Sequence, residues 1–229
     1  PRNGWKNIEL AKMVSYISDN IENISSVIIE PIQCTAGDIY LDASILKNIE
    51  SICKHNNICF IVDEIQTGFG TTGHMWYSEK IGLDPDIIVF GKKSQICGVM
   101  VNDKYAEAIH SQYRRLEVTF DGDLIDAVRG EYILNAIEKH SLLDTVNKNS
   151  LILHNELCKT YDNYRSVGYL IAFDCRNKNQ RDKLVAKAYS NHLLLNPTGE
   201  KSIRIRPNLA FSNNELDEFL VKIKRSSAS

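Results

Sequence analysis

The sequence ICFIVDEIQTGFGTTGHMWYSEKIGLDPDIIVFGKKSQICG, residues Ile58–Gly98, sets the architecture of this chain. It contains two short apolar runs, residues 58–62 and residues 87–90. Continuous apolar runs of this length predict strands that are buried on both faces of a parallel sheet. Asp63 ends the first run and Lys92 follows the second. Because chemistry in such sheets gathers at the carboxyl ends of the strands, we expect these two side chains to face one crevice.

The flanking sequence alternates between helical and strand patterns as far as residue 101. The expected elements are a helix within residues 1–24, a strand over 26–33 that Pro31 ends, a loop over 34–38, a helix around 45–53, a short helix near 76–81 and a strand over 97–101. Strands separated by helices predict an α/β fold, a mostly parallel sheet with crossover connections and flanking helices.

The pattern changes after a loop at residues 118–123. The expected elements there are a helix from Leu124 to Ile137, a helix from Leu142 to Tyr161, strands over 169–173, 192–195 and 203–205, and a last helix opened by the capping box Ser212-Asn213-Asn214-Glu215. We therefore predict two domains, residues 1–140 with the parallel sheet and residues 141–229 as a small α+β domain.

Composition limits the classes of function. The chain has 229 residues and a net charge of −2, so it predicts an ordinary globular protein with neither a nucleic-acid nor a membrane partner. Its six cysteines form no CxxC pair, which predicts core thiols of a reducing, cytoplasmic compartment and no metal site. The chain starts at Pro1 without a signal peptide, and we interpret it as a fragment.

Asp63 and Lys92 each have an ordinary explanation, since an acid at a strand end often caps a turn and a lysine there is usually solvated. Together they suggest more specific chemistry. A carboxylate keeps a ring nitrogen protonated, and a partly desolvated lysine amine forms an imine with an aldehyde. These are the two groups that a protein must supply to pyridoxal phosphate.

The motif around these residues resembles a known family. Asp63–Gly70, Thr72-Gly73 and Pro85-Asp86-Ile87 resemble the signature of class III pyridoxal-phosphate aminotransferases, and Gly91–Gly98 is similar to the lysine 6-aminotransferase group within it. The resemblance runs from Glu30 to Pro207. It implies the carboxyl-terminal part of a fold-type I transferase plus a small α+β domain, with pyridoxal 5'-phosphate as cofactor.

The implied reaction is transfer of the 6-amino group of L-lysine to 2-oxoglutarate, giving glutamate and 2-aminoadipate 6-semialdehyde, in a homodimer. One alternative is transamination of another ω-amino substrate, namely ornithine, acetylornithine or GABA. The other is an inactive split fragment that serves as a binding module.

The resemblance also implies roles for residues next to the ring. Lys92 would bind the cofactor aldehyde and then move the proton, while Lys93 would pack or pair with an acid. Asp63 would form a salt bridge with the ring nitrogen. Ile65 would lie against one ring face, and Gln66 would donate to the phenolic oxygen.

Two further roles lie outside the central motif. Thr119 matches a threonine that reaches the cofactor phosphate of the neighbouring subunit, which is why the resemblance implies a dimer. Arg204 matches the arginine that holds the α-carboxylate of glutamate or 2-oxoglutarate, a bidentate task that suits a guanidinium. An exposed strand arginine is the ordinary explanation of Arg204, and Arg206 is the competing candidate.

The chain departs from the family pattern at four places, of which Arg206-Pro207-Asn208-Leu209 in place of the usual Pro-Pro-Leu ending is minor. Thr35 stands where a glutamate usually pairs with the carboxylate-binding arginine and swings aside for the second substrate. Asp121-Gly122-Asp123 replaces Gly-Gly-Asn and adds a carboxylate near the expected phosphate. The Ser-Gly-Thr phosphate cradle of the family's first half does not precede Pro1. We therefore expect this segment alone to hold the cofactor poorly, to be inactive, and to expose an apolar sheet face.

Overall fold

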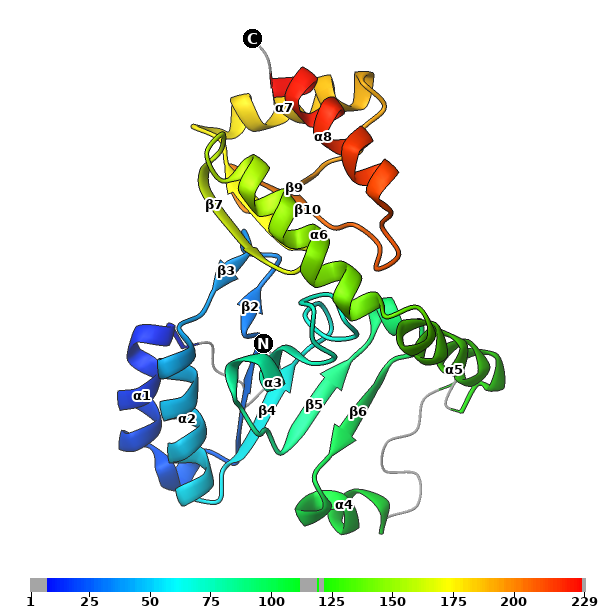
Figure 1. Ribbon diagram of the computed structural model, residues 1–229. Helices are drawn as coiled ribbons and strands as arrows, with labels where there is room; N and C mark the ends of the chain where they lie inside the picture. Colours follow the sequence, from blue (N-terminus) through cyan, green and yellow to red (C-terminus); the bar gives the residue numbers. More distant parts are fainter. Residues whose placement is uncertain (1–7, 112–118, 120–121, 228–229) are drawn as a thin grey trace.

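The computed structural model describes residues 8–111, 119 and 122–227, and they form two four-stranded sheets joined by long helices (Figure 1). The mostly parallel sheet has the order β1-β4-β5-β6, in which only β6 runs antiparallel. Its strands are β1 (Ser26–Ile29), β4 (Cys59–Asp63), β5 (Ile87–Phe90) and β6 (Gly98–Val101). The α/β fold and the predicted strands over residues 58–62, 87–90 and 97–101 are confirmed.

Helices connect these strands. They are α1 (Leu10–Asp19), the short η1 (Ile21–Asn23), α2 (Ala43–His55), α3 (Tyr77–Ile81), the short η2 (Lys92–Ser94) and α4 (Asp103–His110). The Asp42 side chain caps α2 by accepting from the backbone N–H groups of Ser44 and Ile45. In Figure 1, α1 and α2 lie side by side, and α2 contacts β4.

The single strand expected over residues 26–33 is wrong. The chain breaks after Ile29, and residues beyond Pro31 form β2 (Ile32–Gln33), which pairs with β3 (Ile39–Tyr40) in a separate two-stranded sheet. Proline has no N–H group to continue the ladder, and its carbonyl instead accepts from Leu41.

One face of the mostly parallel sheet packs on α2. Val27, Phe60 and Val62 are buried there against Leu46 and Ile49. The strand register aligns a row of apolar residues across the other face: Ile28, Ile61, Ile87 and Val101. Ile28 is 39% exposed, and neither β1 nor β6 has an outer neighbour within the described residues. Ile61, Ile87 and Val101 in the same row are half-buried, so the expected exposure of a whole apolar face stays a prediction.

The long helices α5 (Leu124–Lys139) and α6 (Leu142–Leu157) lead to the antiparallel sheet. The helix predicted to reach Tyr161 is four residues too long. The chain turns after Leu157, where the N–H groups of Thr160 and Tyr161 both donate to its carbonyl. Tyr161 fits the apolar pattern of the helix because its ring is also packed in the structure: it stacks on the Phe173 ring, with the two ring centroids 4.1 Å apart.

The antiparallel sheet has the order β7-β8-β10-β9, and α7 and α8 lie together at one end of the molecule (Figure 1). Its elements are β7 (Asp162–Val167), β8 (Leu170–Asp174), α7 (Lys178–Ser190), β9 (Asn196–Thr198), β10 (Ser202–Ile205) and α8 (Asn213–Ser227). The capping box is confirmed, since Glu215 accepts from the Ser212 N–H and hydroxyl at 2.7 Å and donates its own N–H back to that hydroxyl.

The strand predicted over residues 192–195 is wrong. His192 has a left-handed backbone (φ 58°), and the Leu193 N–H closes the end of α7 by donating to Ala188. Leu195 is buried although it lies in a loop, and the strand β9 starts at the next residue.

The six cysteines are free thiols, and three of them, Cys34, Cys53 and Cys175, are buried. Among the described residues no helix is long and apolar enough to cross a membrane.

Candidate functional site

Two neighbouring strand ends place Asp63 and Lys92 at the same edge of the sheet. β4 and β5 are parallel, and Asp63 pairs in register with Val89, one residue before the end of β5. Glu30 follows β1, in which Ile29 is paired with Val62, so Glu30 lies laterally beside Asp63. Burial raises the pKa of Glu30, the Asp63 carboxylate raises it further, and Lys92 lowers it. These three charges therefore share one electrostatic environment.

Glu30 was not singled out by the sequence reasoning, which treated it only as part of a motif. The available signal was its position at the end of a predicted strand, next to Pro31. Two carboxylates at adjacent strand ends repel each other, which disfavours the charged form of Glu30.

Asp63 and Glu64 have different partners although they are adjacent. One Asp63 oxygen accepts from the Ile65 N–H at 2.9 Å, and the other has no hydrogen-bond partner among the described residues. The Glu64 carboxylate is buried and accepts from the Thr67 hydroxyl and from the N–H groups of Tyr77 and Ser78. Glu64 therefore fixes the start of α3, whereas Asp63 keeps an oxygen available for a ligand.

Lys92 lies on an unusual backbone. Its φ is +55°, in the left-handed region that non-glycine residues rarely adopt, and it starts the turn η2, closed by the Gln95 N–H on the Lys92 carbonyl. The preceding Gly91 allows close packing, because a Cβ there would lie 2.9 Å from the Cys97 sulfur. The Lys92 side chain is exposed, and its ammonium forms no hydrogen bond or ion pair with a described residue.

The Lys93 side chain, unlike that of Lys92, has a hydrogen-bond partner within the described chain. Its Nζ donates to the Pro207 carbonyl at 3.1 Å, which ties η2 to the chain just after β10. Burial and, to a smaller extent, the nearby Arg206 guanidinium lower the pKa of Lys93 to about 8. The ammonium has a carbonyl partner but no carboxylate partner among the described residues, so Lys93 packs and does not pair with an acid.

Lys93→Met is expected to stabilise the protein at neutral pH. Because the folded-state pKa falls from 10.5 to about 8, the folded protein binds fewer protons than the unfolded chain between these values. The free energy of unfolding therefore rises with pH between about pH 8 and pH 10.5. Below about pH 8 the buried charge lowers the free energy of unfolding by up to about 3 kcal/mol. Urea unfolding at pH 7.5 and pH 10 should show a variant advantage that shrinks at the higher pH. An advantage that is equal at both pH values would contradict this account.

Arg204 and Arg206 on and after β10 differ in their partners. The Arg206 guanidinium forms an ion pair with both oxygens of Asp38, which is fully buried. Arg204 contacts only the Cys34 carbonyl, at a long 3.4 Å, and its Nε is buried without a hydrogen-bond partner. Of these two arginines, Arg206 is paired with a carboxylate, whereas Arg204 has no carboxylate partner among the described residues.

The remaining predicted residues have mixed placements. Ile65 and Gln66 are half-buried and follow Asp63 and Glu64 at the strand end. Thr119 is exposed in a turn before α5, and its expected role toward a neighbouring subunit stays a prediction. Asp121, the departure noted in the same loop, lies outside the described residues.

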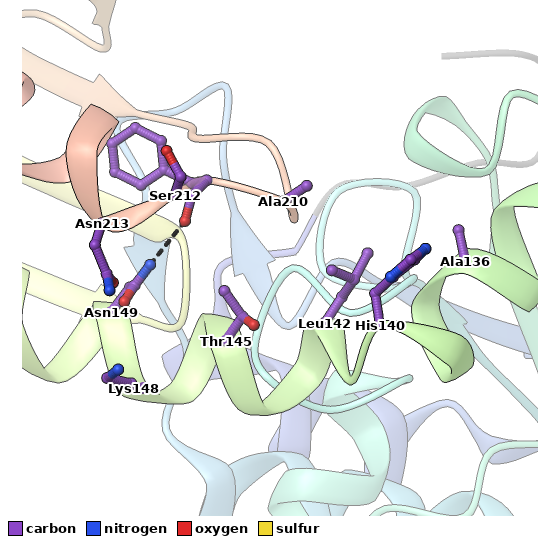
Figure 2. A pocket seen from close by; sticks show the side chains of 10 residues that line it. Ala136, His140, Leu142, Thr145, Lys148, Asn149, Ala210, Ser212 and Asn213 are labelled. Carbon is purple, nitrogen blue, oxygen red and sulfur yellow. Dashed lines mark hydrogen bonds between the residues drawn. The ribbon is translucent and has the colours of Figure 1, made fainter.

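A separate cavity of about 590 Å³ lies between the α5–α6 junction and the start of α8 (Figure 2). His140, Lys148 and Asn149 line it, and the Asn149 amide donates to the Phe211 carbonyl at 2.8 Å. None of the strand-end residues lines this cavity. In the part of the chain that the structure describes, no group of His, Cys, Asp and Glu side chains could hold a metal ion.

Comparison with known proteins gives consistent matches. A family profile described as "Aminotransferase class-III" matches residues 2–226. The L-lysine-epsilon aminotransferase of Amycolatopsis lactamdurans is 33% identical over 217 residues, which cover 90% of this chain and 48% of that protein. The 4-aminobutyrate aminotransferase of Schizosaccharomyces pombe is 34% identical over 211 residues, which cover 87% and 44%.

Solved structures agree with these matches. The lysine aminotransferase from M. tuberculosis in its internal aldimine form superposes with a TM-score of 0.84 at 28% identity, and the match covers 95% of this chain and 52% of that one. The chain thus spans about half the length of the relatives it matches.

Proposed function

The chain belongs to the class III aminotransferases, and we propose that the complete protein moves the 6-amino group of L-lysine to 2-oxoglutarate, giving glutamate and 2-aminoadipate 6-semialdehyde. The similarity to lysine aminotransferases in both sequence and structure supports this choice of substrate. The observation that carries the reaction class is that Asp63 and Lys92 lie at one edge of two adjacent parallel strands.

The strand-end groups fit the family's cofactor, pyridoxal 5'-phosphate, which when bound serves as an electron sink for the carbon bearing the amino group. The free Asp63 oxygen would hold the ring nitrogen protonated, and the unpaired Lys92 ammonium would supply the amine that binds the aldehyde. Lys92 would then carry the proton between substrate and cofactor carbons. Ile65 would cover one ring face, and Gln66 would donate to the ring oxygen.

The outer parts of the proposed site depend on the complete protein. Arg204 would hold the substrate α-carboxylate, and Thr119 would reach the cofactor phosphate of a second subunit in a homodimer. We further propose that residues 1–140 are the later part of the cofactor-binding domain and that residues 141–229 are the small domain. The two main apolar cores support this division, since one lies within residues 13–83 and the other within 146–223.

Another ω-amino substrate remains the alternative with specific support, because 4-aminobutyrate aminotransferases match at similar identity. An inactive fragment that serves as a binding module is the second alternative, and it is supported by Thr35 in place of the expected glutamate. A screen of the complete protein with L-lysine, ornithine, acetylornithine and GABA separates the three. Turnover of L-lysine supports the proposal, turnover of another donor alone supports the first alternative, and no turnover supports the second.

Arg204→Met is expected to raise the KM for 2-oxoglutarate about 10- to 100-fold, because it removes charge-assisted hydrogen bonds to the carboxylate. Initial rates of the complete protein with each donor at varied 2-oxoglutarate measure the effect. Arg176→Met is the matched control, since Arg176 is an exposed arginine beyond β8. Equal KM values for the two variants would remove Arg204 from the proposed site.

A further inference from the structure

Glu30 extends the line of strand β1, although the hydrogen-bonded strand ends one residue earlier. It precedes Pro31, and the residue before a proline is strongly biased toward extended backbone. The alternation of a strand therefore continues to Glu30, which lies on the same face as Ile28. Ile28 pairs with Ile61 on β4, and Asp63 follows Ile61 by two residues on that face. The two carboxylates are thus lateral neighbours on one face of the sheet.

The charges that act on Glu30 come from β4 and η2. Burial raises the pKa of Glu30 and the Asp63 carboxylate raises it further, whereas the Cys34 N–H and the Lys92 ammonium lower it. Burial also raises the pKa of the Cys34 thiol to about 11, so this thiol is uncharged at neutral pH. Among the described residues, Asp63 and Lys92 are therefore the charges that act on Glu30, and their effects are opposite.

The electrostatic coupling between Glu30 and Lys92 acts through space and in both directions. A cation that stabilises a carboxylate is stabilised by that carboxylate to the same extent. The proposed reaction uses the Lys92 nitrogen first as an amine and then as a base, so this nitrogen has to hold a proton and later release it. Asp63 is assigned to the ring nitrogen, and Glu30 is the second carboxylate at these strand ends.

We propose that Glu30 is a positioning residue of the strand-end site, whose carboxylate holds the proton on the Lys92 nitrogen. Glu30 acts through Lys92 and needs no contact with the substrate. This inference rests on the proposed function of Lys92 and adds the group that sets the pH at which Lys92 releases its proton. Because only the ionised carboxyl attracts a cation, the effect is present above the pKa of Glu30 and is lost as the pH falls through it.

The absorbance of pyridoxal phosphate bound to the complete protein measures this effect, because the band depends on whether the Lys92 nitrogen attached to the cofactor carries a proton. Glu30→Gln keeps the size of the side chain and removes its charge. It should lower the midpoint of the pH titration of the absorbance by about half a pH unit or more. Glu30→Asp retains the charge on a shorter side chain, and its shift should be clearly smaller than that of Glu30→Gln.

Glu22→Gln is the matched control. Glu22 is an exposed acid in the short helix η1, before the amino end of the same strand. Its removal changes the net charge by the same amount, but solvent and salt screen its effect on the strand-end site. The midpoint of Glu22→Gln should therefore stay within about 0.2 pH unit of the wild type.

A second measurement needs neither bound cofactor nor turnover. The lysines of the cofactor-free complete protein are dimethylated with ¹³C-formaldehyde, and the methyl signals are followed by NMR as the pH is raised. The Lys92 signal is the one that disappears in Lys92→Arg. Glu30→Gln should move the midpoint of this signal to lower pH by about 0.3 pH unit or more, and Glu22→Gln should leave it in place.

Equal absorbance midpoints for the wild type and Glu30→Gln overturn the inference, and so does a shift in Glu30→Asp as large as that in Glu30→Gln. If Glu30→Gln fails to hold the cofactor, the NMR midpoints decide by the same comparison of wild type and Glu30→Gln. A complete protein that binds no pyridoxal phosphate would overturn the proposed function. The NMR midpoints would still show whether Glu30 holds the proton on the Lys92 nitrogen.

Discussion

Lys92→Ala in the complete protein is expected to abolish amino-group transfer, with a loss of at least about 10³-fold in kcat. Lys92 is the exposed amine at the strand-end site, and no described group competes for its ammonium. Alanine removes both the amine that binds the aldehyde and the base that moves the proton. Pyridoxal phosphate should then bind reversibly and should be lost on dialysis.

The cofactor bond itself gives a measurement that does not depend on turnover. Borohydride reduction of the loaded protein followed by peptide mass spectrometry should locate the adduct on Lys92 in the wild type and find none in Lys92→Ala. Lys93→Ala is the matched control, because its ammonium is directed to the Pro207 carbonyl and the adduct should persist. An adduct on Lys93 in the wild type, or a stable imine absorbance band in Lys92→Ala, would contradict the assignment.

Asp38→Asn is expected to cost about 3–5 kcal/mol of the free energy of unfolding, because it leaves the Arg206 guanidinium charged and unpaired in a buried position. Asp38 is fully buried, and the Arg206 side chain is only 14% exposed. The pair joins the 34–38 loop to the end of β10, so its loss should loosen the contact between the two sheets. Urea unfolding of the wild type and the variant at neutral pH measures the difference.

Asp84→Asn is the control for a generic loss of one carboxylate. Its partner Lys54 lies at 2.8 Å, but Asp84 is 82% exposed, so the expected cost is below about 1 kcal/mol. Adding Arg206→Met to Asp38→Asn should recover part of the stability, because the pair is then removed as a whole. Equal costs for the two single variants would show that Arg206 remains solvated or finds another partner.

The sequence predicted those parts of the fold that are governed by local pattern. The runs over residues 58–62 and 87–90 are continuous and apolar, and they form adjacent parallel strands whose ends bring Asp63 and Lys92 to one edge. β7 was missed because its sequence DNYRSV is polar and lies at an edge of its sheet. An edge strand pairs with only one neighbouring strand and buries only one of its faces. Its sequence therefore shows little of the apolar periodicity from which strands are predicted.

The finer parts of the site depend on contacts that no local pattern encodes. Asp38 and Arg206 are 168 positions apart, and nothing in either neighbourhood distinguishes Arg206 from Arg204 as the paired arginine. The contrast between Asp63 and Glu64 is similar. Asp63 ends β4 and Glu64 follows it directly, and only the return of the chain at Tyr77 and Ser78 shows which carboxylate is used to fix a helix.

The left-handed backbone at Lys92 has a practical consequence for engineering this protein. A side chain in that conformation costs roughly 1 kcal/mol relative to glycine, so Lys92→Gly should relax the turn while removing the reactive amine. A library ranked by melting temperature alone would therefore enrich inert proteins at this position. Thermal tolerance and turnover have to be scored side by side in any such campaign.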